Sequence, residues 1–142
     1  MPITQISIAV ENKPGKLHEV CEILEKEHIN IKGIMSSTKL EPVQLHMIVD
    51  DPDKALNVFN NKGYITASKE VIAVSAPDHP GGLNAVLRTL LEKQVNVETL
   101  YPFIKLSGGE AILILEVDKI IEAKEILKKH WIKTYGPEIY KM

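Results

Sequence analysis

The same succession of apolar and polar patterns occurs twice along this chain of 142 residues. Residues 6–10 alternate with a period of two, which is typical of a strand with one buried face. After a turn, apolar residues recur at i, i+3, i+4 and i+7, the pattern of an amphipathic helix. The residues at these helical positions are Leu17, Val20, Cys21 and Leu24 in the first half, and Leu83, Val86, Leu87 and Leu90 in the second.

The repeat is also visible in the letters of the sequence. The segment VENKPGKLHEVCEILEKEHINI at 10–31 corresponds to APDHPGGLNAVLRTLLEKQVNV at 76–97, with an offset of 66 residues. Both segments contain Asn or Asp followed by Pro-Gly, and these residue types favour a turn because they restrict φ or tolerate a positive φ. Each helix is followed by a hydrophobic-Asn-hydrophobic triplet that begins a second strand.

Two more strands and one more helix complete each half. Asp51 followed by Pro52 predicts the N-terminus of the second helix, and Asp118 is expected to cap the corresponding helix. Third strands are predicted at 43–49 and 111–117, and short fourth strands at 64–67 and 132–135. The second half has two extra residues in the hairpin at 107–109.

The order of elements in each half is therefore β-α-β-β-α-β, the ferredoxin-like α+β fold. Right-handed crossovers place both helices on one face of a four-stranded antiparallel sheet. We expect two domains, at 1–68 and 69–142. Each would be marginally stable alone, so the halves are expected to pack together. The link between about residue 67 and residue 71 is short enough to permit strand exchange.

Composition narrows the classes of function. Apolar residues make up 44% of the chain and charged residues 25%, which is ordinary for a globular protein. The net charge of −2 and the lack of a basic block argue against a nucleic-acid partner. No apolar run reaches about 18 residues, so no membrane partner is expected. The single cysteine, Cys21, is expected in the core, and a cytoplasmic location is expected.

The sequence gives little sign of catalytic or metal chemistry. The five histidines share no metal-ligand spacing, and neither a CxxC motif nor a Ser-His-Asp arrangement is present. We therefore expect no metal, no cofactor and no catalytic residue, and we do not expect an enzyme.

The two Pro-Gly turns are the candidate binding sites. A helix N-terminus presents unpaired N–H groups and the positive end of the helix dipole, which suit a carboxylate. Gly15 and Gly81 lack a Cβ, so a ligand can approach the backbone. The Asn12 amide can donate to a carboxylate and accept from an ammonium group. Asn12 and Asp78 could instead be ordinary helix caps, and both interpretations stay open.

The repeated β-α-β-β-α-β order, with N-x-P-G-x-L after the first strand, resembles the ACT domain over about residues 4–68 and 70–135. ACT domains are small regulatory modules of amino-acid metabolism. The resemblance implies that two domains pair side by side through their second strands. They would form one eight-stranded sheet with helices on one face, and amino acids would bind at the junction.

The resemblance also implies which residues touch a ligand. By position they are Asn12, Pro14, Gly15 and Leu17 in the first turn, Asp78, Pro80, Gly81 and Leu83 in the second, and Asn30 and Asn96 at the start of the second strands. For the two strand asparagines, local backbone bonding is the other interpretation. Family members that bind serine often carry His two positions before the loop Asn, where this chain has Val10 or Ala76.

The leading hypothesis is a regulatory or sensor protein without a catalytic domain that binds an amino acid or a similar small metabolite. The alternative is a ligand-free assembly module, and a small enzyme on this scaffold is the third hypothesis.

Because Ile112 and Ile114 replace Gln44 and His46 on the third strand, the outer face of the second half needs a cover. We expect a second copy in a homodimer, or the C-terminal tail, to supply it. The sequence does not identify a regulated enzyme.

Overall fold

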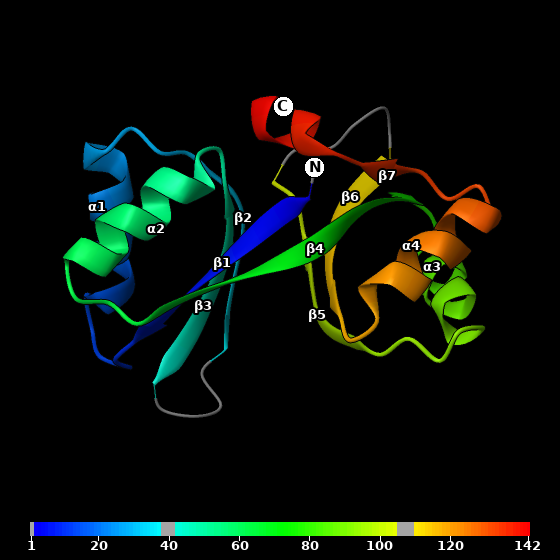
Figure 1. Cartoon of the computed structure of the whole chain (residues 1–142), viewed down its shortest axis with the longest axis horizontal. Coiled ribbons are helices and arrows are strands. Elements are labelled where there is room, and N and C mark those ends of the chain that lie inside the picture. The colour runs from blue at the N-terminus through cyan, green and yellow to red at the C-terminus, as the bar shows by residue number, and fades with distance from the viewer. Residues whose placement is uncertain (1, 38–41, 105–109) are drawn as a thin grey trace. The chain divides into compact units, whose positions relative to one another are not determined.

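The structure is a computed structural model that describes residues 2–37, 42–104 and 110–142 (Figure 1). Its elements are β1 (Ile3–Val10), α1 (Lys16–Lys26), β2 (Ile31–Ser37), β3 (Val43–Val49), α2 (Pro52–Asn61), β4 (Thr66–Pro77), α3 (Gly82–Leu91), β5 (Val97–Pro102), β6 (Glu110–Val117), α4 (Ile120–Lys129), β7 (Thr134–Tyr135) and a terminal 3-10 helix (Pro137–Lys141). The extra residues of the second hairpin, at 107–109, lie outside the described residues. None of the described helices is long and apolar enough to span a bilayer.

The chain forms two compact units. The N-terminal unit is Thr4–Lys69, and the C-terminal unit combines Met1–Ile3 with Glu70–Met142. This division follows contacts within the structure, and the domain boundaries at 1–68 and 69–142 stay a prediction.

In the N-terminal unit the strand order is β2-β3-β1-β4. Strands β1 and β3 are antiparallel, with Ile6 opposite Met47, and α1 and α2 lie on one side of the sheet (Figure 1). The alternating apolar residues of β1 and β3 pack against Val20, Leu24 and Phe59 of the two helices. This is the predicted ferredoxin-like arrangement.

The C-terminal unit repeats this arrangement with the order β5-β6-β4-β7. Strand β4 is antiparallel to β6, with Val74 opposite Leu113, and α3 and α4 cover one side (Figure 1). Ile112 and Ile114 are both fully buried, and so is Ile139 of the terminal 3-10 helix. The outer face of this sheet is therefore apolar and covered, while a homodimer stays a prediction.

The junction of the two halves differs from the prediction. A break was expected between about residue 67 and residue 71, but β4 runs without interruption from Thr66 to Pro77. It is the fourth strand of one unit and the first strand of the other, because residues 66–76 contain neither Gly nor Pro to end a strand. The described residues form seven strands, and the predicted eight-stranded sheet is not confirmed. Strands β2 and β5 each lie at an edge of their unit's sheet.

One of the two predicted caps on the second helices is wrong. Asp51 caps α2 as predicted, since its Oδ1 accepts a hydrogen bond from the Lys54 N–H at 3.2 Å. In α4 the N-cap is Lys119, without a side-chain cap. Asp118 instead accepts the Asn96 N–H at 2.8 Å, because it corresponds to Asp50 rather than to Asp51.

The expected apolar stripes of the first helices are narrower than predicted. Val20 and Leu24 are buried in α1, but Cys21 is exposed and not part of the core. Leu17 and Leu83 are also exposed, by 45% and 39%. Each first helix lies beside an edge strand, so the sheet does not extend far enough to cover the outer side of the helix.

Candidate functional site

The two Pro-Gly turns have the same backbone geometry. Gly15 has φ 85° and ψ −9°, and Gly81 has φ 88° and ψ −8°, so both adopt the left-handed conformation that suits glycine. Each glycine is the N-cap of the helix that follows, α1 or α3. Asn12 and Asp78 therefore do not occupy the N-cap position. No atom lies within 4 Å of a Cβ built on either glycine, so the space beside each turn is open.

The predicted turn residues all lie at the surface. Those of the first turn are Asn12, Pro14, Gly15 and Leu17, and those of the second are Asp78, Pro80, Gly81 and Leu83. An exposed helix N-terminus, a left-handed glycine and an exposed leucine thus lie together in each unit. Such a surface can receive a carboxylate with an apolar group beside it.

The predicted strand asparagines lie elsewhere in each unit. Asn30 and Asp50 form two bonds: the Asn30 N–H donates to the Asp50 carboxylate at 3.0 Å, and the Asp50 N–H donates to the Asn30 carbonyl at 3.1 Å. Asn96 and Asp118 form the same pair, at 2.8 and 3.1 Å. These bonds use only the main chain of the asparagines. Local bonding is thus real, but it does not occupy their amide groups.

Turn and strand residues are not brought together within a unit. The first turn precedes α1 and Asn30 follows it, and this helix has 11 residues. A helix of that length spans about 16 Å. Any small-molecule site that uses both a turn and a strand asparagine therefore needs residues from two domains.

A hollow lies beside each turn, and the two hollows occupy corresponding positions of the repeat. We call them the first turn pocket, of about 380 Å³, and the second turn pocket, of about 260 Å³. The first is lined by Glu11, Lys16, Glu19 and Tyr64 among others, and the second by Pro77, Gly82, Ala85 and Ile132 at the same places. Neither is lined by a predicted turn residue, so the pockets flank the predicted sites.

The first turn pocket carries a network of charges. Lys13 pairs with Glu11 at 2.9 Å, and Lys16 lies 4.0 Å from Glu11 and 3.7 Å from Glu19. The Tyr64 hydroxyl donates to Glu19 at 2.6 Å. The bond from Lys13 lowers the pKa of Glu11, and the bond from Tyr64 lowers the pKa of Glu19. Partial burial, together with Glu19, raises the pKa of Tyr64 to about 12.

At the second turn pocket two backbone segments lie close together, and fewer charged residues line it than line the first. A Cβ built on Gly82 would lie 1.9 Å from the Pro77 carbonyl oxygen, so only glycine fits there. The Ser75 hydroxyl donates a hydrogen bond to Glu110 on the neighbouring strand. Sequence reasoning missed Lys16, Tyr64 and Gly82, although alignment of the two halves places Gly82 opposite Lys16.

Each unit also has a groove between its first helix and its edge strand. In the N-terminal unit it has about 450 Å³ and is lined by Cys21, Ile31 and the predicted residue Asn30. In the C-terminal unit the groove has about 470 Å³ and is lined by Leu87, Leu91 and other apolar residues together with Asn84 and Arg88, but not by Asn96. Among the described residues, no group of three or more His, Cys, Asp or Glu could hold a metal ion.

Comparisons with known proteins agree with this architecture. A family model described as ACT domain pair matches residues 1–135. Protein BT0572 from Bacteroides thetaiotaomicron is similar, with 30% identity over 100% of this chain and 98% of that chain, and a TM-score of 0.91. No curated protein matches this chain.

More distant structures share the fold. The regulatory subunit of aspartate kinase from Thermus thermophilus, in a ligand free form, has 16% identity and a TM-score of 0.66 over 89% of this chain and 91% of that chain. The aspartokinase alpha and beta subunits have 18% identity and a TM-score of 0.64 over 90% and 91%. The family match covers nearly the whole chain and confirms the resemblance drawn from the repeated motif. The chain belongs to the family of ACT domain pairs.

Proposed function

We propose that this protein is a regulatory sensor without catalytic activity that binds an amino acid or a similar small metabolite where two ACT domains meet. One observation supports the proposal. The Pro-Gly turn of the N-terminal unit and its strand asparagine lie at opposite ends of α1, which has 11 residues. A single unit therefore has a turn at one place and a strand asparagine at another, each of which is half of a site. The complete site forms where the turn of one domain meets the edge strand of another.

The chemistry of the two halves suits an α-amino acid. The exposed helix N-terminus after Gly15 favours the carboxylate, and the amide oxygens of Asn12 and of Asn96 from the other domain can accept from the ammonium group. Leu17 is 45% exposed and offers an apolar surface to the ligand side chain. Pairing of edge strands in a homodimer would bring these parts together, and an enzyme of amino-acid metabolism is the kind of partner that the sensor would regulate.

The two turns are proposed to differ in affinity. Asn12 is neutral and can contact either end of an amino acid. Asp78, when ionised, is only an acceptor: it attracts the ammonium group and repels the carboxylate. The Asn12 site is therefore proposed as the better general amino-acid site.

The test begins with a thermal-shift screen of the twenty amino acids at millimolar concentration, because a ligand of the folded state raises its stability. Calorimetry with the best ligand then compares three variants. Asn12→Ala should weaken the tighter binding phase by roughly ten- to a hundred-fold, the effect of a lost bond to a charged group of about 1.5–3 kcal/mol. Asp78→Ala should leave this phase nearly unchanged, as should the control Asn57→Ala on the exposed surface of α2.

Two outcomes would contradict the proposal. If no amino acid stabilises the protein, the ligand-free assembly module becomes the better account. If Asn12→Ala binds as tightly as the unmodified protein, the turn is not the site.

A further inference from the structure

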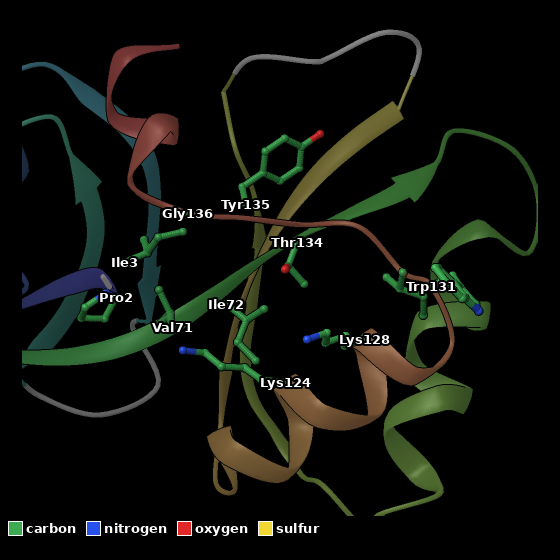
Figure 2. A pocket seen from close by; sticks show the side chains of 11 residues that line it. Pro2, Ile3, Val71, Ile72, Lys124, Lys128, Trp131, Thr134, Tyr135 and Gly136 are labelled. Carbon is green, nitrogen blue, oxygen red and sulfur yellow. The ribbon is translucent and has the colours of Figure 1, made fainter.

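The C-terminal unit has a pocket of about 500 Å³ that contains none of the predicted turn residues and adjoins the second turn pocket, with which it shares Trp131 and Ile132. It lies between α4, the edge of β4 and the short strand β7, and we call it the α4 pocket (Figure 2). Its lining includes Val71, Ile72, Lys124, Lys128, Trp131 and Thr134. This volume is within the range of pockets that bind small molecules.

The pocket exists because β7 is short. Only Thr134 and Tyr135 pair with β4, opposite Val74 and Ala73. Pro137 follows two residues later, and it cannot donate a ladder hydrogen bond, so the chain leaves the sheet and begins a 3-10 helix. Val71 and Ile72 of β4 lie beyond the two residues that pair with β7, and both line the pocket.

Two lysines of α4 provide charge beside this apolar floor. Lys124 and Lys128 are one helical turn apart, and Figure 2 shows both side chains extending along the pocket with their amino groups directed toward the same side. Lys124 is paired with Glu70. Within the described residues no ion pair involves Lys128. Of these two lysines, only Lys128 lacks an acidic partner among the described residues, so it leaves one uncompensated positive charge on this side of the pocket.

The other repeat shows that these residues are not required by the fold. At the positions of Lys124 and Lys128 the N-terminal unit has Leu56 and Asn60. Thr66, which corresponds to Thr134, donates its hydroxyl to Asn60 at 2.6 Å. The N-terminal unit thus closes this corner with a neutral hydrogen bond, whereas the C-terminal unit leaves it open and positively charged.

Trp131 gives a second reason to assign a role to this pocket. It is 94% exposed and has a φ of 61°, in the left-handed region where the first repeat has Gly63 with φ 86°. A bulky residue in that conformation costs about 1–2 kcal/mol, and its apolar ring gains little from so exposed a place. Its ring lies at the end of the α4 pocket that adjoins the second turn pocket, where it can contact the apolar part of a ligand.

We propose that the α4 pocket binds a small organic anion. One carboxylate or phosphate group would contact the Lys128 amino group and the Thr134 hydroxyl. The apolar body would lie against Ile72 and Trp131. A single anionic group matches the single uncompensated charge, since Glu70 already neutralises Lys124. This site is independent of the amino-acid site proposed at the turns.

The experiment uses the fluorescence of Trp131, the only tryptophan of the chain. The full-length protein is titrated with hexanoate, hexyl phosphate, hexanol and inorganic phosphate. Hexanoate or hexyl phosphate should change the emission and saturate, and the stronger of the two identifies the anionic group. Hexanol and inorganic phosphate should each bind at least about tenfold more weakly, because each lacks one of the two required parts.

Matched lysine variants test the assignment. Lys128→Gln should weaken the better hexyl anion about tenfold, whereas Lys129→Gln, an exposed neighbour outside the pocket lining, should bind like the unmodified protein. Asn12→Ala should also leave this titration unchanged, so failure of the amino-acid site would not affect the result. Equal binding of hexanol, no response to either hexyl anion, or normal binding by Lys128→Gln would overturn the proposal.

Discussion

The two turns of the repeat share a backbone but differ in what surrounds it. Gly15 and Gly81 have φ values of 85° and 88°, yet one turn is bordered by ion pairs and the other by a close backbone contact. The first is held by Lys13, Lys16 and their carboxylate partners at the surface, where such pairs contribute little and are weakened by salt. The Pro-Gly motif thus fixes the path of the chain, while the flanking residues set the chemistry of each turn.

This difference also predicts a difference in rigidity. Exposed ion pairs can rearrange when a charged ligand arrives, so the first turn can adapt. The contact between Gly82 and Pro77 involves backbone atoms and cannot relax without moving the turn. We expect the first turn to adjust on binding and the second to remain as it is.

The largest effect is expected at Gly82. Gly82→Ala places a Cβ against the Pro77 carbonyl oxygen, and the resulting strain should lower the free energy of unfolding by about 3 kcal/mol, the upper part of the range for overpacking. The matched change in the other repeat, Lys16→Ala, should cost less than about 0.5 kcal/mol. Urea denaturation measures both, and equal losses would remove the distinction between the two turns.

The turn glycines should be equivalent. Gly15→Ala and Gly81→Ala each force a Cβ into the left-handed conformation, which costs about 1–2 kcal/mol, and no neighbouring atom adds to this. Asparagine tolerates this conformation better, so Gly15→Asn and Gly81→Asn should lose less. If denaturation experiments show clearly different losses in the free energy of unfolding for the two alanine variants, the two turns do not have the same backbone conformation.

The second helices test a smaller difference between the repeats. Asp51→Ala removes the N-cap of α2 and should lower the free energy of unfolding by about 1 kcal/mol. Lys119→Ala changes the corresponding residue of α4, a helix without a side-chain cap. This variant should change the free energy of unfolding by only a few tenths of the loss expected for Asp51→Ala. A loss at Lys119 as large as that at Asp51 would contradict the different capping.

The smallest effect concerns Tyr64, which has no counterpart because the second repeat has Ile132 at that position. Its pKa is raised from 10.0 to about 12, so its contribution to stability is complete below pH 10 and is lost as pH rises toward 12. Tyr64→Phe should abolish this alkaline loss. It should also bring the lowered pKa of Glu19 back toward its usual value. Absorbance titration follows the phenol and NMR the carboxylate, and an unchanged Glu19 titration would mean that the bond does not form in solution.

Most elements of both repeats could be predicted from the sequence alone. Strand and helix periods, the Pro-Gly turns and the Asp51-Pro52 cap are signals within a few neighbouring residues, and each depends on backbone conformations that those residues fix locally. The duplicated motif strengthened these signals, because two independent copies gave the same order. It also located the two turns, although their flanking pockets were not predicted.

Tertiary structure decided which faces are covered and where one element ends. Cys21 and Leu17 fit an apolar stripe, but β2 is an edge strand and leaves that side of α1 exposed. Two expected strands became the single strand β4, since only pairing partners distinguish its two parts. The α4 pocket joins residues 71–72 to residues 124–136. The local periodicity of apolar residues indicates on which face of a helix or strand a residue lies. Burial and cavities depend instead on packing between segments that are distant in the sequence.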